Sequence, residues 1–266
     1  MKSKKIYFLG ILSFLFAGIL LNSCTKSFDQ KTTQLLDLNS QSIVQVYMAT
    51  VNANRNFIYV DGNPVTGALM TSGSLFPSSG YGFSLNGGVR SFLIRDTLSA
   101  TTQIPFTFSQ NMQAGKNYTV FLYDSITAPN QKTVFTNITI PTDTSARIRF
   151  ANFVHAKTAI PAIDIFSVRR NANVVTNLQI TDVTDFIPFP SRLTDTFYVR
   201  IAGSGTNLMN ITPPPPTSIP GNVLTPITAI LTPTAKRSYT IVFRGSYTTT
   251  LTNALQVRAL SSFANY

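Results

Sequence analysis

The sequence predicts an all-β fold, and three observations lead to this. Glutamate, a favoured helix former, is absent, and all ten acidic residues are aspartate, which prefers turns. Short runs rich in Val, Ile, Phe and Tyr are separated by Asp-Gly, Asn-Gly and Asn-Pro turn pairs. Apolar residues make up 44% of the chain and charged residues 12%, a composition that supports a packed core and argues against global disorder.

A short apolar segment near the N-terminus ends at the only cysteine of the chain. Ile6–Leu21 holds sixteen residues, three lysines precede it within the first five positions, and Ser23 and Cys24 follow it. This order is typical of a secretory signal, which would comprise residues 1–23. With cysteine at the cleavage point, the segment resembles the lipobox of bacterial lipoproteins, and the resemblance implies acylation of Cys24. An uncleaved anchor, although shorter than the ~20 residues that span a bilayer, and a plain secretory signal are the alternatives.

The lipid would hold the mature chain at the cell envelope. Two or more acyl chains anchor stably, at about 0.8 kcal/mol per buried CH2 group. Thr25 rather than Asp follows the cysteine, and by resemblance to the sorting rule of Gram-negative lipoproteins this favours the cell outer membrane. The sequence leaves open whether the protein faces the periplasm or the cell surface. Residues 24–41 are polar and aperiodic, and we interpret them as a lipidated flexible tether.

The charge of the chain bears on its partners. The formal net charge is +11, and without the three lysines of the signal it is +8, from 18 basic and 10 acidic side chains. Export from the cytoplasm argues against nucleic acid as a partner. A basic surface suits lipid head groups or anionic polysaccharide, and an ordinary solvated surface is the alternative. We expect the membrane as a partner through the anchor, together with an envelope protein or polysaccharide that the sequence does not identify.

Short strands begin after the tether and define a first domain, residues 42–142. Runs of five to eight residues at this spacing are typical of a β-sandwich or a barrel. The expected strands are Ile43–Met48, Asn56–Val60, Tyr81–Leu85, Val89–Arg95, Phe106–Phe108, Tyr118–Tyr123 and Val134–Ile140. Asp61-Gly62 and Asn86-Gly87 mark turns between them.

The same order of strands recurs in a second domain, residues 145–266. The predicted equivalent pairs are Val46 and Ile148, Ile58 and Ile163, Val89 and Phe197, and Tyr118 and Tyr239. The offset grows from 102 to 121 residues, so 19 residues are inserted, and Gly203–Pro226 with its run of four prolines is the expected place. Proline cannot donate ladder hydrogen bonds, so we predict a protruding surface loop that contributes little to stability. We also expect each domain to fold alone.

Three segments of the second domain resemble the bacterial family named domain of unknown function 4397. They are Ala146–Phe153, Pro161–Ile165 and Lys236–Phe243, similar to family patterns of the type ARVRFVNASP, PAVDVYVDG and AGKSYTVV. The first domain keeps the second and third elements, as Ile58–Gly62 and Ala114–Val120, and departs from the pattern in its opening strand. The resemblance implies tandem immunoglobulin-like or prealbumin-like β-sandwich domains in a secreted or lipid-anchored protein. It implies no activity and no ligand residues.

The chain offers little for catalysis or metal binding. His155 is the only histidine, and we expect it in a loop. Without glutamate or a free cysteine, acid–base chemistry would fall to aspartate pairs, but Asp182 and Asp185 are expected to form turns. No cluster has zinc or calcium spacing, and no Gly-rich loop is placed to hold phosphate. We therefore predict no enzyme activity, no catalytic residue, no metal and no cofactor.

Alternation along the strands assigns several side chains to structural roles. In the run from Arg147 to Phe150, the period of two places both arginines outward, where they are expected to form weak surface salt bridges with an Asp on a neighbouring strand. The same rule places Asp164 outward. Tyr118 and Tyr239 are expected to be structural tyrosines whose hydroxyl groups bond to backbone at a crossover.

These observations favour a non-catalytic structural or protein-interaction module, with a surface glycan-binding lipoprotein as the alternative. The candidate ligand contacts are aromatic residues expected to be exposed: Tyr81, Phe186, Phe189 and Tyr247. Two weak Asp-Ser/Thr-apolar motifs also resemble O-glycosylation sites of some Gram-negative lineages. They make Thr97 and Ser125 candidate O-glycosylation sites, with ordinary turns as the alternative interpretation.

Overall fold

The structure is a computed structural model that describes residues 38–265 apart from 80, 99, 214–220 and 253. Asp37–Tyr266 forms one compact unit of the chain. The predicted all-β class is confirmed, because the described residues form strands in several sheets and a single 3-10 turn, η1 (Leu38–Ser40). The signal, Cys24 and the tether up to residue 37 lie outside the described residues.

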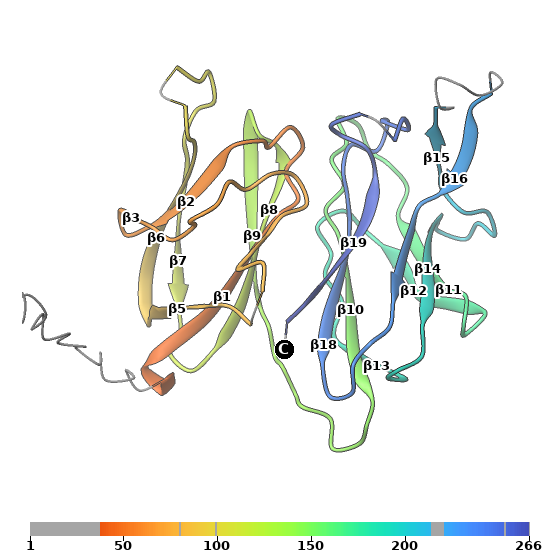
Figure 1. Ribbon diagram of the computed structural model, residues 1–266, viewed down its shortest axis with the longest axis horizontal. Helices are drawn as coiled ribbons and strands as arrows, with labels where there is room; N and C mark the ends of the chain where they lie inside the picture. The colour runs from red at the N-terminus through yellow and green to blue at the C-terminus, as the bar shows by residue number, and fades with distance from the viewer. Residues whose placement is uncertain (1–37, 80, 99, 214–220, 253, 266) are drawn as a thin grey trace, which may run out of the picture. The chain divides into compact units, whose positions relative to one another are not determined.

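Two sheets form the first half of this unit (Figure 1). The strands are β1 (Gln41–Met48), β2 (Asn56–Val60), β3 (Asn63–Pro64), β4 (Leu75–Phe76), β5 (Phe83–Asn86), β6 (Gly88–Asp96), β7 (Phe106–Met112), β8 (Asn117–Ser125) and β9 (Ala128–Phe135). One sheet has the order β4-β1-β8-β9, with β5 also paired to β1, and the other has the order β3-β2-β6-β7. β1 and β8 run parallel.

The second half repeats this arrangement. Its strands are β10 (Ala146–Asn152), β11 (Ile163–Ser167), β12 (Ala172–Leu178), β13 (Ile187–Phe189), β14 (Asp195–Ile201), β15 (Met209–Thr212), β16 (Val223–Pro226), β17 (Thr228–Leu231), β18 (Ser238–Arg244) and β19 (Ala259–Ala264). One sheet has the order β13-β10-β18-β19, the other β12-β11-β14-β17, and β15 and β16 form a further two-stranded sheet. β10 and β18 run parallel, as β1 and β8 do.

Local sequence explains most of these elements. The predicted turn at Asp61-Gly62 is present, with φ angles of 49° and 80° that join β2 to β3. The expected strand Val134–Ile140 is wrong, because the strand that pairs with β8 is Ala128–Phe135. Its first six residues are mostly polar, so alternation did not reveal it, and a tight turn at Ile126-Thr127 sets its register.

An apolar core lies between the two sheets of each half, built from alternate residues of both sheets. In the first half Val44, Val46, Val120 and Leu122 face Ile58, Val60, Phe92 and Ile94. In the second half Ile148, Phe150, Ile241 and Phe243 face Ile163, Ile165, Phe197 and Val199.

Matching backbone hydrogen bonds show which residues correspond in the two halves. Ile43 N–H donates to the Lys116 carbonyl, and Arg147 N–H donates to the Arg237 carbonyl in the same way. These bonds and the strand registers give the equivalent pairs Val44–Ile148, Gln45–Arg149, Tyr59–Phe166, Phe92–Phe197, Arg95–Arg200 and Tyr118–Tyr239. The predicted alignment was therefore displaced by two residues in β1 and β2 and by three in β6. A period-two pattern looks the same after a shift of two.

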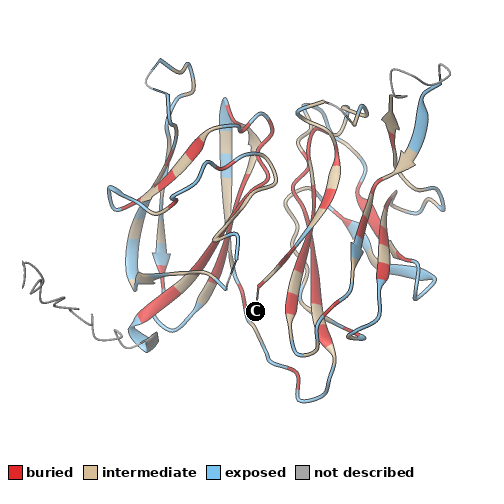
Figure 2. Cartoon of the chain, in the orientation of Figure 1, coloured by how far each residue is buried: buried red, intermediate tan, exposed pale blue. Residues whose placement is uncertain are grey.

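The two halves pack against each other through the sheets that contain β1 and β10 (Figure 1). The outward faces of these sheets form a third apolar cluster: Tyr47, Ala49, Phe121, Ala151, Phe153, Val242 and Phe263. Phe121 stacks on Phe153 with ring centroids 4.5 Å apart, and Tyr47 stacks on Phe263 at 5.2 Å. β1 and β10 are therefore buried almost throughout, in contrast to the outer strands (Figure 2).

The insertion in the second half contains sixteen residues rather than the predicted 19. The offset is 105 residues from Arg95 to Arg200 and 121 from Phe108 to Ala229, so the extra residues lie between β14 and β17. This is the expected place, but the prediction that all of Gly203–Pro226 is a loop is wrong, because two strands form within it. β15 and β16 pair there, and Asn210 Nδ2 donates to the Arg258 carbonyl at 2.8 Å. Residues 214–220 of the proline-rich tip lie outside the described part.

Candidate functional site

The polar centre of the interface between the halves is built on the equivalent residues Gln45 and Arg149. Gln45 Nε2 donates to the Ala264 carbonyl at 2.9 Å, and its Oε1 accepts from Asn265 at 2.8 Å. Arg149 Nη2 donates to Thr119 Oγ1 at 2.9 Å and to Thr136 Oγ1 at 3.1 Å. Thr136 and Asn265 are themselves equivalent by register. Each half thus places its β1-type residue on the last strand of the other half, the pattern of an isologous contact.

Arg149 corrects a prediction. It was expected to be exposed and paired with an aspartate, but it is only 2% exposed, and no carboxylate among the described residues forms an ion pair with it. Its Nε donates to Thr240 Oγ1 at 2.8 Å, and its guanidinium lies 4.7 Å from the ring centre of Phe186. The face that points away from its own core is covered by the other half. Burial lowers the pKa of Arg149 to about 9, because desolvation disfavours the charged form.

A cleft of about 470 Å³ opens beside this arginine, and we call it the Arg149 cleft. Its lining residues are Val134, Phe135, Asn137, Thr139, Arg147, Arg149, Val183, Thr184, Asp185 and Phe186. Arg147 is half-buried, and its Nη1 donates to Ser145 Oγ at 3.1 Å. Two cations, one carboxylate, two aromatic rings and several hydroxyl and amide groups therefore converge there. The pairing expected for Arg147 with an aspartate of a neighbouring strand is also absent among the described ion pairs.

The equivalent place in the first half holds a neutral cleft, which we call the Ile43 cleft. Its volume is about 380 Å³, and Ile43 and Asn265 line it. By strand register Ile43 is equivalent to Arg147, which lines the Arg149 cleft, and Asn265 is equivalent to Thr136. Tyr81, Gly82, Asn117, Ile138 and Ile140 complete the lining. None of the described residues that line it carries a charge, so the two clefts are related in position but differ in charge.

A third cleft, the Tyr59 cleft, lies on the outer face of the sheet that contains β2 and β6. It holds about 470 Å³ and is lined by Phe57, Tyr59, Arg95, Asp96, Thr97, Leu98, Thr101, Gln103 and Pro105. Arg95 lies 4.6 Å from the ring centre of Tyr59 and donates to its hydroxyl at 2.8 Å. The Leu98 N–H and then Arg55 hold the pKa of Asp96 below its usual range.

The pair of Tyr59 and Arg95 has a counterpart in the second half. The equivalent Phe166 and Arg200 lie 3.6 Å apart, measured from the guanidinium carbon to the ring centre. Sequence reasoning missed both pairs and the Arg149 network. For the Arg149 network, the available signal was apolar runs such as Val120–Leu122 and Ile241–Phe243. A strand that is buried on both faces loses its alternation of polar and apolar residues.

The four predicted aromatic contacts do not converge on one site. Tyr81 is 42% exposed, lines the Ile43 cleft and accepts a hydrogen bond from Arg237. Phe186 lines the Arg149 cleft. Tyr247 is half-buried against the second core, near Arg258. The expectation that Phe189 is exposed is wrong, because it is 2% exposed on β13 and packs in that core against Phe150 and Phe197.

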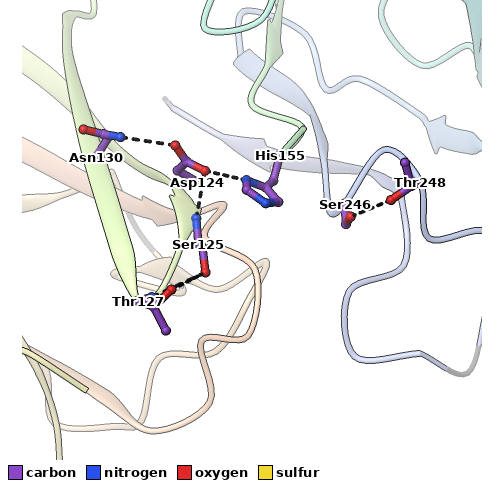
Figure 3. Close-up of polar contacts among 7 residues, drawn as sticks. All are labelled: Asp124, Ser125, Thr127, Asn130, His155, Ser246 and Thr248. Atoms are coloured by element: carbon purple, nitrogen blue, oxygen red, sulfur yellow. Dashed lines mark hydrogen bonds and ion pairs between the residues drawn. The ribbon is translucent and has the colours of Figure 1, made fainter. Parts of the chain in front are cut away.

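The two candidate O-glycosylation residues differ in accessibility. Thr97 is exposed beside the Tyr59 cleft. Ser125 is half-buried at the end of β8, and its hydroxyl shares a hydrogen bond of 2.9 Å with Thr127 (Figure 3). Thr97 is therefore the more accessible acceptor. Cys24, the predicted lipidation site, lies outside the described residues.

His155 lies in the loop after β10, where it bonds to the other half. Its Nδ1 contacts Asp124 Oδ1, and the same carboxylate accepts the Ser125 N–H at 3.0 Å and Asn130 Nδ2 at 3.2 Å (Figure 3). A histidine oriented by a carboxylate could act as a base, but within the described part no hydroxyl bonds to its Nε2. Ser246 forms a β-bridge with His155 through the backbone, and its hydroxyl pairs with Thr248 at 3.5 Å instead (Figure 3). The arrangement acts as a contact between the halves.

Asp182 and Asp185 do not form a carboxylate pair. Asp182 accepts the Gln179 N–H at 3.0 Å and forms the expected turn, whereas Asp185 lies exposed in the Arg149 cleft. Within residues 38–265 and their gaps, no group of three His, Cys or acidic side chains is arranged to bind a metal ion. In the described part of the chain, no helix has the length and apolar character needed to cross a membrane.

Comparison of the sequence with protein-family models finds no matching family, and comparison with curated proteins finds no significant match. The resemblance to the domain-of-unknown-function 4397 family therefore remains a prediction carried by the segments quoted above.

Proposed function

We propose that this protein is a lipid-anchored module of the cell envelope that binds or organises other envelope components without catalysis. The anchor rests on the signal that ends at Cys24 and on the residue after it, which favours the outer membrane. The proposal also draws on the resemblance to the 4397 family, which implies secreted or anchored sandwiches without known activity.

The observation that carries the proposal is where the polar side chains lie and what they bond to. The buried ones, Gln45, Arg149 and Asn265 among them, bond across the two halves and hold them as one unit. The accessible ones line the open Arg149, Ile43 and Tyr59 clefts. A compact unit with several open clefts suits recognition, whereas catalysis needs a nucleophile, a base and an orienting group brought together.

Capture of envelope partners by the mature protein tests this proposal. Full-length protein purified in mild detergent, after cross-linking in the envelope, should retain one or a few defined partners. Substitutions on the faces of the clefts should release them, while a Val89→Asp variant on an exposed strand should not. Turnover of an envelope substrate by the purified protein, lost in a cleft variant, would overturn the non-catalytic assignment.

A second candidate function, glycan binding, is favoured by the Tyr59 cleft. Sugar sites combine an aromatic ring, on which the C–H face of the sugar packs, with polar groups for its hydroxyls. Phe57 and Tyr59 supply the rings, while Arg95, Asp96 and Gln103 supply donors and acceptors. Tyr59→Ala should abolish retention on a glycan array, while Phe166→Ala, at the equivalent place in the other half, should not. Unchanged retention in Tyr59→Ala would remove this cleft as the glycan site.

A further inference from the structure

The guanidinium of Arg149 has unused hydrogen-bonding capacity. An arginine carries five N–H donors. Nε bonds to Thr240, and Nη2 bonds to Thr119 and Thr136, which accounts for three of them. Nη1 has no hydrogen-bond partner among the described residues, although the side chain is 2% exposed. Arg149 also lines the open cleft. A buried cation without a counter-ion is costly, and a ligand anion would offset that cost.

The surroundings of Arg149 limit what the anion can be. Arg147 adds a second cation to the cleft, and Asp185 adds one negative charge. One carboxylate near two guanidinium groups disfavours a dianion such as a phosphate monoester and tolerates a single negative charge. Bidentate pairing of a guanidinium with a carboxylate is strong and geometrically specific. The electrostatics therefore match a monocarboxylate.

The remaining lining residues match a hydroxylated ring. Phe135 is 48% exposed and presents an aromatic surface to the cleft. Asn137 and Thr139 offer amide and hydroxyl groups, and Asp185 can accept from a hydroxyl. A ring with an apolar C–H face, several hydroxyl groups and one carboxylate would use all three kinds of group at once.

We propose that the Arg149 cleft binds a uronic acid residue, with its carboxylate on Arg149 Nη1 and Arg147 and its ring on Phe135. The site rests on the glycan-binding candidate for the general class of ligand and names a distinct place and chemistry for it. The Ile43 cleft supplies an internal comparison, because the arginines at the equivalent positions are replaced by Ile43 and Gln45.

Calorimetric titration of the mature protein in detergent with sodium glucuronate and sodium galacturonate tests the proposal. Saturable binding is expected, and the methyl esters should bind about tenfold more weakly or worse, because the charge-assisted bonds are lost. Glucose and galactose should behave like the esters. Acetate should bind more weakly than either uronate, since it lacks the ring. Equal binding of acetate would show a bare anion site and would overturn the assignment to a sugar.

The decisive variant is Arg149→Gln, because glutamine is the residue that stands at the equivalent position of the first half. It should lower uronate affinity about tenfold or more while leaving the melting temperature close to that of the wild type. Arg147→Gln, at a half-buried position, gives a second test that does not depend on the interface and should also weaken binding. Arg200→Gln is the matched control, since Arg200 also lies over a phenylalanine but outside this cleft.

The outcomes separate this inference from the proposed function. Absence of uronate binding, or unchanged affinity in both Arg149→Gln and Arg147→Gln, overturns the site even if the protein still captures partners or neutral glycans. Loss of uronate binding in Tyr59→Ala, with affinity intact in Arg149→Gln, would move the carboxylate to the Tyr59 cleft and overturn the site as well.

Discussion

Tyr118 and Tyr239 hold the same hydrogen bond at equivalent places in the two halves. The Tyr118 hydroxyl accepts from the backbone N–H of Gln113 at 3.1 Å, and the Tyr239 hydroxyl accepts from that of Thr234 at 3.0 Å. In each half the donor lies five residues before the tyrosine, in the turn that enters β8 or β18. The predicted structural role of these tyrosines is confirmed.

Removing either hydroxyl should destabilise the protein modestly. Tyr118→Phe and Tyr239→Phe each leave one backbone N–H without its partner, and we expect each to lower the free energy of unfolding by about 1 kcal/mol. Urea denaturation followed by circular dichroism measures this. Tyr198→Phe, on the outer face of its sheet, is the control and should have little effect. Equal stability in all three variants would show that water replaces the bond fully.

Replacing Arg149 by methionine should not destabilise the protein at pH 7. The substitution removes a buried cation without a counter-ion, while Thr119 and Thr136 keep their mutual bond of 2.8 Å. We expect a free energy of unfolding equal to that of the wild type or higher by about 1–3 kcal/mol. A loss of several kcal/mol would mean that the arginine hydrogen bonds outweigh the desolvation.

The lowered pKa of Arg149 predicts a pH dependence. Burial lowers its pKa from the ordinary arginine value to about 9 on folding, so between these two values the unfolded chain binds a proton that the folded chain has released. Stability from this group therefore increases as pH rises above 9, by about 1.4 kcal/mol per unit. From pH 8 to pH 10, the free energy of unfolding of the wild type should rise relative to that of Arg149→Met. Urea denaturation of both proteins at the two pH values measures this. The difference between the two proteins removes the contributions of all other titrating groups. A difference that stays the same at both pH values would contradict the lowered pKa of Arg149.

The base of the insertion should contribute to stability. Asn210 is 7% exposed, and its Nδ2 donates to the Arg258 carbonyl. Asn210→Ala leaves that buried carbonyl without this partner, and we expect a cost of about 1–3 kcal/mol. Thr225→Ala, on the paired strand β16, removes only a hydroxyl contact of 3.1 Å with Thr212 and is the control. A difference in melting temperature between the two variants measures the effect.

Separate expression of the halves tests both folding and association. Residues 42–142 and 145–266 each retain an apolar core, so each is expected to fold, and the third cluster is expected to drive their association. Analytical ultracentrifugation of the mixture should show a heterodimer. Tyr47→Asp should abolish it, while Val89→Asp, 68% exposed elsewhere, should not. Two disordered fragments would show instead that the halves share one folding unit.

The sequence predicted what depends on local pattern. Strand runs such as Asn56–Val60 and the turn at Asp61-Gly62 follow from alternation and backbone preference, which are properties of neighbouring residues. It did not predict the strand Ala128–Phe135. This segment forms a strand because it pairs with β8, and its own residue pattern does not indicate one. The burial of Arg149 was missed for a related reason. Alternation shows which side of a sheet a residue lies on, but it does not show what covers that side.

The isologous contact between the halves has a consequence for the history and use of the chain. A single unit pairing with its own copy must bury the same residue on both sides of the axis, so an arginine there would be desolvated twice. Covalent fusion removes that constraint, and the chain now carries Arg149 on one side and Gln45 on the other. A duplicated ancestor could therefore acquire a charged cleft while its twin stayed neutral. With one charged cleft, such a chain binds one charged ligand per molecule, even though it contains two equivalent halves.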